Sequence, residues 1–272
     1  MYIPVEGLRT SRGRERLAAV LRSSNGYVTV DSAAEALKID REQAAKLLAR
    51  WRKQGWLKRL RRGLYVPIPI DVVSAERTLV NAWSLVPQVF EPGYVGGWSA
   101  AEHWDLTEQI FHEVCVFTTR PQRRKRQDLG EVAFMVFRVQ SEHLFGSTAI
   151  WQGSVRVPVS DPHRTIIDML SRPRVGGGIR HTADCLDAYL DSAGCDLETL
   201  VKYGDQLGNG AVFKRLGFLL ERSKRPDAPT LEACRDRLTA GNARLDPALT
   251  ADSLVTCWRL WVPKSWRKSR RD

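Results

Sequence analysis

The stretch DREQAAKLLARWRKQGWLKRLRRGLYVP, residues 40–67, decides the fold of the N-terminal region. Its first half predicts a helix over about residues 41–54, because apolar side chains recur there at helical spacing. These side chains are Ala44, Leu47, Leu48 and Trp51. Asp40 is suited to cap the start of this helix, with Gln43 three residues on, and Gly55 is suited to end it.

The second half of the stretch predicts a β-hairpin. Two short strands, at about residues 56–60 and 64–66, flank Arg61-Arg62-Gly63, which is able to form the turn. Upstream, the apolar spacing predicts two further helices, over residues 14–23 and 31–38, with a short extended piece at 27–29. Three helices followed by a basic hairpin predict an N-terminal winged helix-turn-helix.

Positive charge is concentrated on the predicted third helix and hairpin. Residues 41–62 hold nine Lys or Arg and a single acid, Glu42. Helix–turn–helix proteins lay such a helix face in the major groove, where Arg and Lys reach guanine and Gln pairs with adenine. A basic wing lies beside the phosphate backbone or in the minor groove. The candidate DNA-binding residues are therefore Arg41, Gln43, Lys46, Arg50, Lys53, Lys58, Arg59, Arg61 and Arg62.

The charge also indicates how the chain is organised. The net charge of the 272 residues is +11, of which residues 1–70 contribute +9 and residues 262–272 contribute +4. Residues 71–261 therefore sum to −2. We expect a winged-helix DNA-binding domain at 1–70, a second domain at 71–261 and a basic tail at 262–272. Some winged helices dock proteins instead of DNA, but a docking wing does not need four basic side chains.

The residues after 70 predict a mixture of strands and helices. Apolar patterns predict strands at 113–118, 132–139 and 155–159. Helices are expected at 75–85, 161–170, 182–190, 197–203 and 212–221. The predicted fold class is therefore α+β, with an N-terminal winged helix-turn-helix followed by a mixed α+β domain.

The second domain contains residue types found in enzymes but no catalytic set. Ser99, His103 and Asp105 lack a Gly-x-Ser-x-Gly elbow, and one short helix would not orient the serine and histidine as nucleophile and base. His181 and Cys185 share a helical face, but so few ligands do not define a zinc site. We therefore expect no catalytic residue, no metal and no cofactor.

Composition places the chain among globular proteins. It is 43% hydrophobic and 27% charged, which excludes wholesale disorder. No apolar run approaches the ~18–20 residues that span a bilayer, and no secretory signal is visible. Five cysteines without a C-x-x-C pair argue against a disulfide framework, so we expect a cytoplasmic protein that does not bind membranes.

Two basic segments leave more than one interpretation open. Residues 120–126 contain five Lys or Arg, which suits either a second nucleic-acid contact or a solvated loop. The tail ends in Trp266-Arg267-Lys268-Ser269-Arg270-Arg271 and suits a phosphate-binding arm.

Two motifs, taken in order after the winged helix, resemble a known family. Residues 97–109 read GWSAAEHWDLTEQ and residues 157–173 read VPVSDPHRTIIDMLSRP, followed by a Gly-rich segment. A chain with these features resembles the AbiEi-type antitoxin and transcriptional regulator of the abortive-infection AbiE systems, which are type IV toxin–antitoxin systems. The resemblance covers most of residues 10–225 and does not extend beyond about residue 232.

The resemblance implies a function that composition does not show. Such proteins repress their own operon by binding inverted repeats in its promoter through the winged helix. Their C-terminal domain counteracts a nucleotidyltransferase-like toxin encoded next door, without a necessary stable complex. The family offers no catalytic residue, and its DNA-binding surface corresponds here to the third helix and the wing.

Two other functions are compatible with a winged helix joined to an α+β domain. One is a transcriptional regulator that responds to a small molecule through the second domain. The other is an enzyme acting on nucleic acid, for which the winged helix would be a targeting module.

Overall fold

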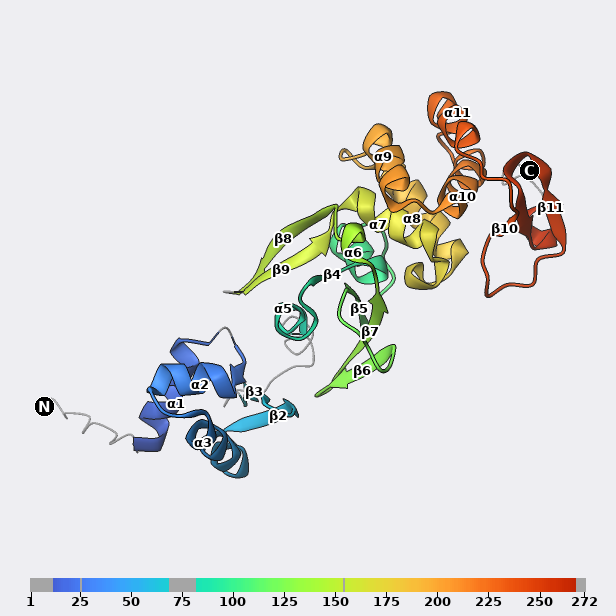
Figure 1. Ribbon diagram of the computed structural model, residues 1–272. Helices are drawn as coiled ribbons and strands as arrows, with labels where there is room; N and C mark the ends of the chain where they lie inside the picture. Colours follow the sequence, from blue (N-terminus) through green and yellow to red (C-terminus); the bar gives the residue numbers. More distant parts are fainter. Residues whose placement is uncertain (1–11, 25, 69–81, 154, 268–272) are drawn as a thin grey trace, which may run out of the picture. The chain divides into compact units, whose positions relative to one another are not determined.

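The computed structural model describes residues 12–24, 26–68, 82–153 and 155–267. Its chain divides into two compact units, which are described separately below (Figure 1). Unit 1 comprises residues 1–85 with two short segments, 128–133 and 151–156. Unit 2 comprises the rest of the chain from Val86 onward.

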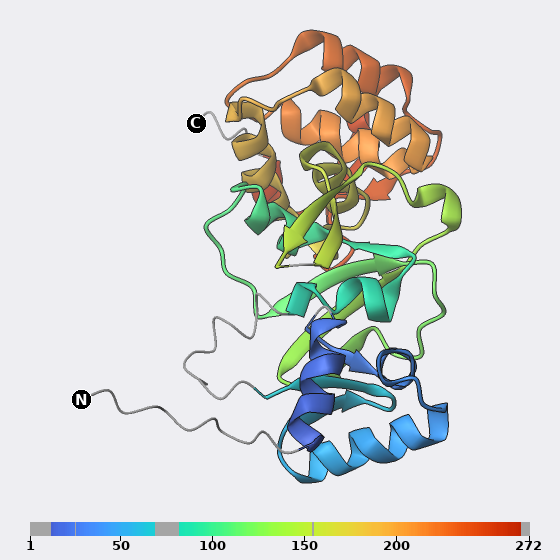
Figure 2. The same ribbon diagram turned by 90° about the vertical axis from the view of Figure 1, so that its left-hand side faces the viewer.

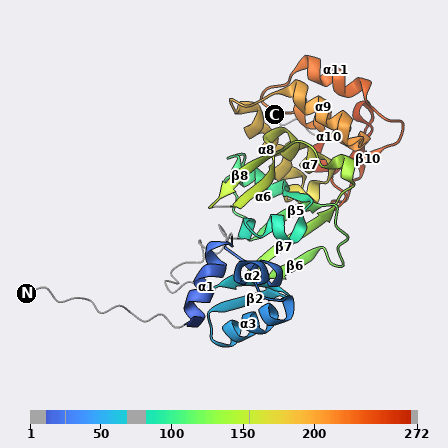
Figure 3. The ribbon, with the colours of Figure 1, turned by 60° about the vertical axis from the view of Figure 1, so that its left-hand side comes forward.

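Unit 1 contains the predicted winged helix. Its elements are α1 (Arg12–Arg22), β1 (Val28–Thr29), α2 (Val30–Leu37), α3 (Arg41–Lys53), β2 (Leu57–Arg61) and β3 (Leu64–Pro67). The strands form a small sheet in the order β1-β3-β2, with antiparallel pairing throughout. Figure 3 shows the three helices beside this sheet. The prediction of an N-terminal winged helix-turn-helix is confirmed.

The core of the winged helix is small and apolar. Its buried side chains come from every element: Val20, Val28, Ala33, Ala44, Leu48, Trp51, Leu57 and Tyr65. Trp51 is the largest of them and is 1% exposed. Burying such a side chain is worth roughly 1.5–3 kcal/mol, so the inner face of α3 holds the helix in place.

Unit 2 contains most of a six-stranded mixed sheet in the order β6-β7-β5-β4-β9-β8, in which the strand residues within 128–133 and 151–156 are those counted with unit 1. The strands are β4 (Gly93–Val95), β5 (Glu113–Thr118), β6 (Arg126–Leu129), β7 (Val132–Arg138), β8 (Ser147–Gln152) and β9 (Val155–Ser160). β4 pairs antiparallel with β5 and parallel with β9, which makes the sheet mixed. The α+β fold class is therefore confirmed.

Helices cover this sheet, and those after residue 178 gather at one end of it, where Figure 2 shows them in yellow and orange. They are α5 (Val86–Phe90), α6 (Gly97–His103), α7 (Pro162–Ser171), α8 (Ile179–Asp191), α9 (Leu197–Leu207), α10 (Gly210–Leu220) and α11 (Ala228–Asp236). Three short 3-10 segments and a 3-10 turn at Pro173–Gly176, which follows α7, complete the unit. No helix in the described part of the chain is long and apolar enough to cross a membrane.

A second sheet lies near the C-terminus and was not predicted. It has the order β10-β12-β11, with β10 at Ala243–Arg244, β11 at Ser253–Val255 and β12 at Leu260–Val262. Val262 is fully buried, and Trp266 packs against the core of unit 2. The described part of the expected basic tail is therefore folded onto this unit and is not an extended arm.

Most predicted elements of the second domain are present with small shifts at their ends. The strand expected at 113–118 has these bounds, and the helix expected at 161–170 begins one residue later, capped by Asp161. The helix expected at 75–85 falls mainly on residues 69–81, which lie outside the described residues.

Candidate nucleic-acid interface

The start and end of α3 are set by local chemistry. The Asp40 carboxylate accepts a hydrogen bond from the backbone N–H of Gln43 at 2.7 Å, which satisfies one of the open donors of the first turn. Gly55 follows the helix with φ of 75°, a backbone conformation that side chains with a Cβ rarely adopt. Asp40 and Gly55 therefore set the two ends of α3, and with them the residues whose side chains the helix exposes to solvent.

The outer face of α3 consists of long polar side chains. Gln43, Lys46, Arg50 and Lys53 are exposed opposite the buried apolar stripe, and Arg41, which is also exposed, is the first residue of the helix and lies roughly 180° around its axis from Arg50. Two of these cations lie close to carboxylates. Arg41 Nη1 lies 2.8 Å from the Asp31 carboxylate of α2, and Lys46 Nζ lies 2.7 Å from Glu42 one turn earlier. Both pairs are solvent-exposed, so the ion pairs contribute little stability and compete only weakly with a phosphate.

The wing presents the second group of candidate residues. β2 and β3 pair from Leu57↔Pro67 to Arg61↔Leu64, which leaves Arg62 and Gly63 in a two-residue turn. Gly63 has φ of 80°, as the turns that join tight hairpins require. Lys58, Arg59, Arg61 and Arg62 are all exposed on this hairpin.

One wing residue has a close acidic neighbour. Lys58 Nζ donates to the Glu131 carboxylate at 2.6 Å, within unit 1. This hydrogen bond holds the pKa of Glu131 below its ordinary value. Lys58 therefore offers less unbalanced charge than its neighbours on the hairpin.

All nine candidate residues are thus exposed, and they lie on two consecutive elements of one small domain. Within the part of the chain that the structure describes, Arg50, Lys53, Arg59 and Arg62 are in no ion pair. Unpaired guanidinium and ammonium groups on an exposed helix and hairpin are what a phosphate-rich duplex requires.

The comparisons with known proteins agree with this geometry. Residues 15–68, which span α1 to β3, match the model of a protein family described as "Transcriptional regulator, AbiEi antitoxin". The winged helix is of the AbiEi type. For the winged helix this confirms the family that the sequence resembles, and the match does not extend to the two motifs at residues 97–109 and 157–173.

The fold of the whole chain that carries this AbiEi-type winged helix also has a solved counterpart. It is similar to the crystal structure of the RV2827C protein from Mycobacterium tuberculosis, with a TM-score of 0.64 and 17% sequence identity. The similarity covers 93% of this chain and 92% of that chain. At this identity the likeness shows a shared fold. A comparison with curated proteins finds no match.

The motif at residues 157–173 has a structural role in unit 2. Arg164 and Asp168 lie one turn apart on α7, fully buried or nearly so, with Nε and Oδ1 separated by 3.0 Å. The Tyr94 hydroxyl donates to Asp168 at 2.9 Å and accepts from Arg164 at 3.0 Å. The Arg164 guanidinium also lies 4.0 Å from the centre of the Phe145 ring. Sequence reasoning noted the motif but not this buried cluster, whose Tyr94 comes from a strand that was not predicted.

Side chains considered as catalytic or metal-binding candidates are engaged in local structure. The Ser99 hydroxyl accepts the backbone N–H of Cys115 at 2.9 Å. His181 Nδ1 donates to the Gly176 carbonyl at 2.5 Å, and its Nε2 shares a hydrogen bond of 2.7 Å with the Thr107 hydroxyl. Burial raises the pKa of the Cys185 thiol to about 12. Among the described residues, no group of three or more His, Cys, Asp or Glu is placed to hold a metal.

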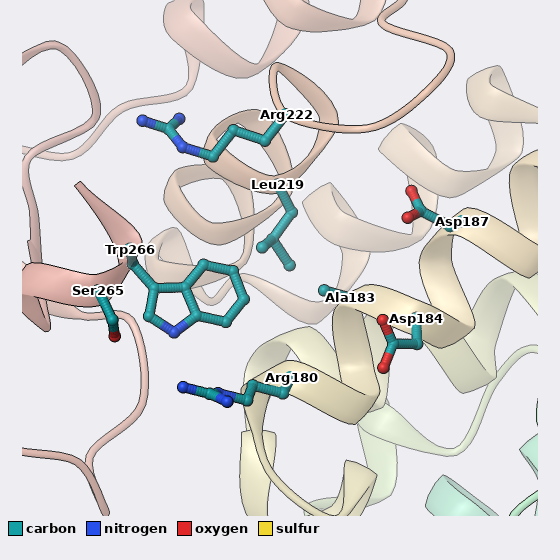
Figure 4. Close-up of a pocket in the computed structure, with 8 residues that line it drawn as sticks. All are labelled: Arg180, Ala183, Asp184, Asp187, Leu219, Arg222, Ser265 and Trp266. Atoms are coloured by element: carbon teal, nitrogen blue, oxygen red, sulfur yellow. The ribbon is translucent and has the colours of Figure 1, made fainter. Parts of the chain in front are cut away.

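A hollow of about 350 Å³ lies in unit 2 beside α8 and the end of α10. Figure 4 shows the Trp266 ring in this hollow with Arg180 and Arg222 on either side of it. Asp184 and Asp187 also line it, so its charges are mixed. This hollow does not favour a strongly anionic or cationic ligand.

Proposed function

We propose that the protein is a transcriptional autorepressor that binds operator DNA of its own operon through the AbiEi-type winged helix. One observation carries the proposal: the family-matched segment exposes a basic α3 face and a basic wing, with four cations in no described ion pair. In this arrangement α3 enters the major groove of an inverted repeat, and the wing contacts the adjacent phosphates.

Each candidate residue has a distinct part in this binding mode. Gln43, Lys46, Arg50 and Lys53 face the base edges, because they share the outer side of α3. Arg59, Arg61 and Arg62 neutralise phosphates. Lys58 leaves its ion pair with Glu131 and pairs with a phosphate instead. Arg41, at the start of the helix, likewise leaves its ion pair with Asp31 and pairs with a phosphate.

We further propose that unit 2 is the antitoxin part of a type IV toxin–antitoxin system in the cytoplasm. It counteracts a nucleotidyltransferase-like toxin without needing a stable complex with it. The match of the winged helix at residues 15–68 to an AbiEi antitoxin family, together with the motifs at residues 97–109 and 157–173 of unit 2, supports this proposal. The neighbouring genes distinguish this function from that of a regulator that senses a small molecule. An adjacent reading frame for a nucleotidyltransferase-like protein favours the antitoxin.

The first experiment is footprinting of the purified protein on the DNA upstream of its start codon, with excess competitor DNA at two salt concentrations. We expect protection of an inverted repeat that survives the competitor. Binding that disappears with competitor DNA at both salt concentrations would contradict the autorepressor. Rescue of cells from the neighbouring toxin would then be the deciding assay for the antitoxin role.

A further inference from the structure

Unit 2 contains a basic groove that none of the functions above uses. It has a volume of about 1000 Å³ and is lined by four segments far apart in the sequence. These are residues 122–125 before β6, residues 136–138 of β7, the segment 171–178 between α7 and α8, and residues 246–248. We call this feature the body groove.

Six cations surround the body groove. They are Arg123, Arg124, Lys125, Arg138, Arg172 and Arg174, and all six are exposed. None of them is in an ion pair with another described residue. Residues 71–261 sum to −2, so this concentration of positive charge is local to the groove.

The acid among the described residues that line the groove is in no ion pair with these cations. Asp246 is 5% exposed, and both of its carboxylate oxygens are used. One accepts the backbone N–H of Ile179 at 3.0 Å, at the start of α8, and the other accepts that of Ala248 at 2.9 Å. The six cations are therefore exposed and in no described ion pair, although Arg172 is near enough to the buried Asp168 to favour its charged form.

The shape and lining of the groove indicate which polyanion fits. Five of the six cations are arginines, whose planar guanidinium matches phosphate geometry. A duplex is read by protruding helices and hairpins, whereas a single strand enters a concave basic groove. A protein partner would use large apolar anchors, but Val136, Phe137 and Pro173 at this site are buried.

We propose that the body groove binds the phosphate backbone of a single-stranded nucleic acid. The cations on residues 123–125 contact successive phosphates along one wall, and those on residues 172 and 174 contact them along the other. The groove offers no exposed aromatic ring among its described lining residues, so recognition rests on phosphates and tolerates different bases.

The test uses the full chain with its winged helix disabled by Arg50→Ala, Lys53→Ala, Arg61→Ala and Arg62→Ala. Fluorescence anisotropy measures binding of labelled oligo(U) and oligo(dT), each of about 12 nucleotides. Titrations are made at about 50 and 200 mM salt. We expect this four-site variant to bind both strands. Tighter binding of oligo(U) would show that the groove prefers RNA and contacts the 2′-hydroxyl. Equal binding of the two strands would show that the groove recognises the phosphates alone.

The groove is then removed from the four-site variant by adding Arg123→Ala, Arg124→Ala and Arg174→Ala. We expect the affinity to fall by at least about tenfold and the slope of log affinity against log salt to shrink by about 2, at ~0.7 for each phosphate that is no longer neutralised. The matched control adds Lys202→Ala, Lys224→Ala and Arg267→Ala, which removes the same charge from exposed sites outside the groove. If this triple lowers the affinity as much, general charge and not the groove explains the binding.

Two competitors test the kind of polyanion. Unlabelled duplex of the same length that displaces the strand equally well would overturn the single-strand assignment, and so would an oligoglutamate peptide. Circular dichroism checks folding, and the single charge reversal Arg124→Glu provides the same readout if the triple variant does not fold. The outcome is separate from operator binding, because every variant used carries the same four substitutions in the winged helix, so a difference between variants comes from unit 2.

Discussion

Arg164 and Asp168 place two opposite charges inside unit 2, where an unpaired charge is costly. Their side chains are 0% and 4% exposed, and Tyr94 bonds to both. Removing one partner of a buried pair leaves the other charge without compensation, whereas removing an exposed pair costs little. The role of this cluster is structural, because each of its polar side-chain atoms except Arg164 Nη1 has a described partner.

We expect Asp168→Ala to lower the free energy of unfolding by about 3–5 kcal/mol, because it leaves the buried guanidinium unpaired. Chemical denaturation followed by circular dichroism measures this change. Asp191→Ala is the matched control, since Asp191 pairs with Arg225 at 3.0 Å at an exposed site and should cost at most about 1 kcal/mol. Equal losses in the two variants would show that the buried pair has no special role.

At the scale of elements, α3 and the wing divide the work of DNA binding. α3 places Gln43, Lys46, Arg50 and Lys53 on the side opposite its buried Ala44, Leu48 and Trp51. The wing is a β-hairpin with a two-residue turn, and its cations lie in and next to that turn. A helix face can specify bases, and a short basic turn supplies charge that does not depend on sequence.

Arg50→Ala combined with Lys53→Ala should weaken specific operator binding by about 1–3 kcal/mol for each base that is no longer hydrogen-bonded. Binding to unrelated DNA should change much less. The control is Arg52→Ala, because Arg52 is exposed on the same helix but lies roughly 160° around its axis from Arg50. Quantitative gel shifts measure both, and unchanged operator affinity in the double variant would contradict the assignment of α3 as the reading helix.

Arg61→Ala combined with Arg62→Ala should act differently from the α3 changes. Binding to operator and to unrelated DNA should weaken by the same factor, because phosphates are present in every sequence. The slope of log affinity against log salt should shrink by about 2, at ~0.9 for each duplex phosphate that the wing neutralises. A loss confined to the operator would instead place the wing at the bases.

The sequence predicts elements well where a strong local pattern exists. The helix expected at 41–54 ends at Lys53, because its apolar stripe, its Asp40 cap and Gly55 all agree. β8 was missed because its residues are exposed or half-buried and show no apolar alternation, and β10 has only two residues. The body groove cannot be predicted locally, because it joins segments around residues 124, 138, 173 and 247.

At the scale of the whole molecule, charge and apolar core are distributed unequally. Unit 1 carries a basic exposed surface over a small core, and unit 2 carries a much larger core beneath a nearly balanced surface with one basic groove. The proposed repressor and antitoxin roles therefore rest on different sets of residues. Each role should be removable without the other.

The variant Arg50→Ala, Lys53→Ala, Arg61→Ala, Arg62→Ala tests this separation in cells. It should lose repression of a reporter driven by the operon's promoter and keep its rescue of cells that express the neighbouring toxin. Reporter activity and colony counts measure the two effects. The complementary variant Asp168→Ala should weaken rescue, because it destabilises unit 2, and should keep repression. Loss of both functions in the four-site variant would show that neutralisation needs DNA binding.

The position of Trp258 near the end of the chain determines the order in which the two cores of a newly made chain can be completed. The winged-helix core is complete once Tyr65 has emerged from the ribosome, because all its buried members precede that residue. The core of unit 2 instead waits for Trp258, whose ring fills the space that Gly217 leaves beside α10, and for Val262 after it. On the proposed function, each molecule acquires its operator-binding element well before its antitoxin element. A chain cut short by premature termination would be a repressor without protective activity.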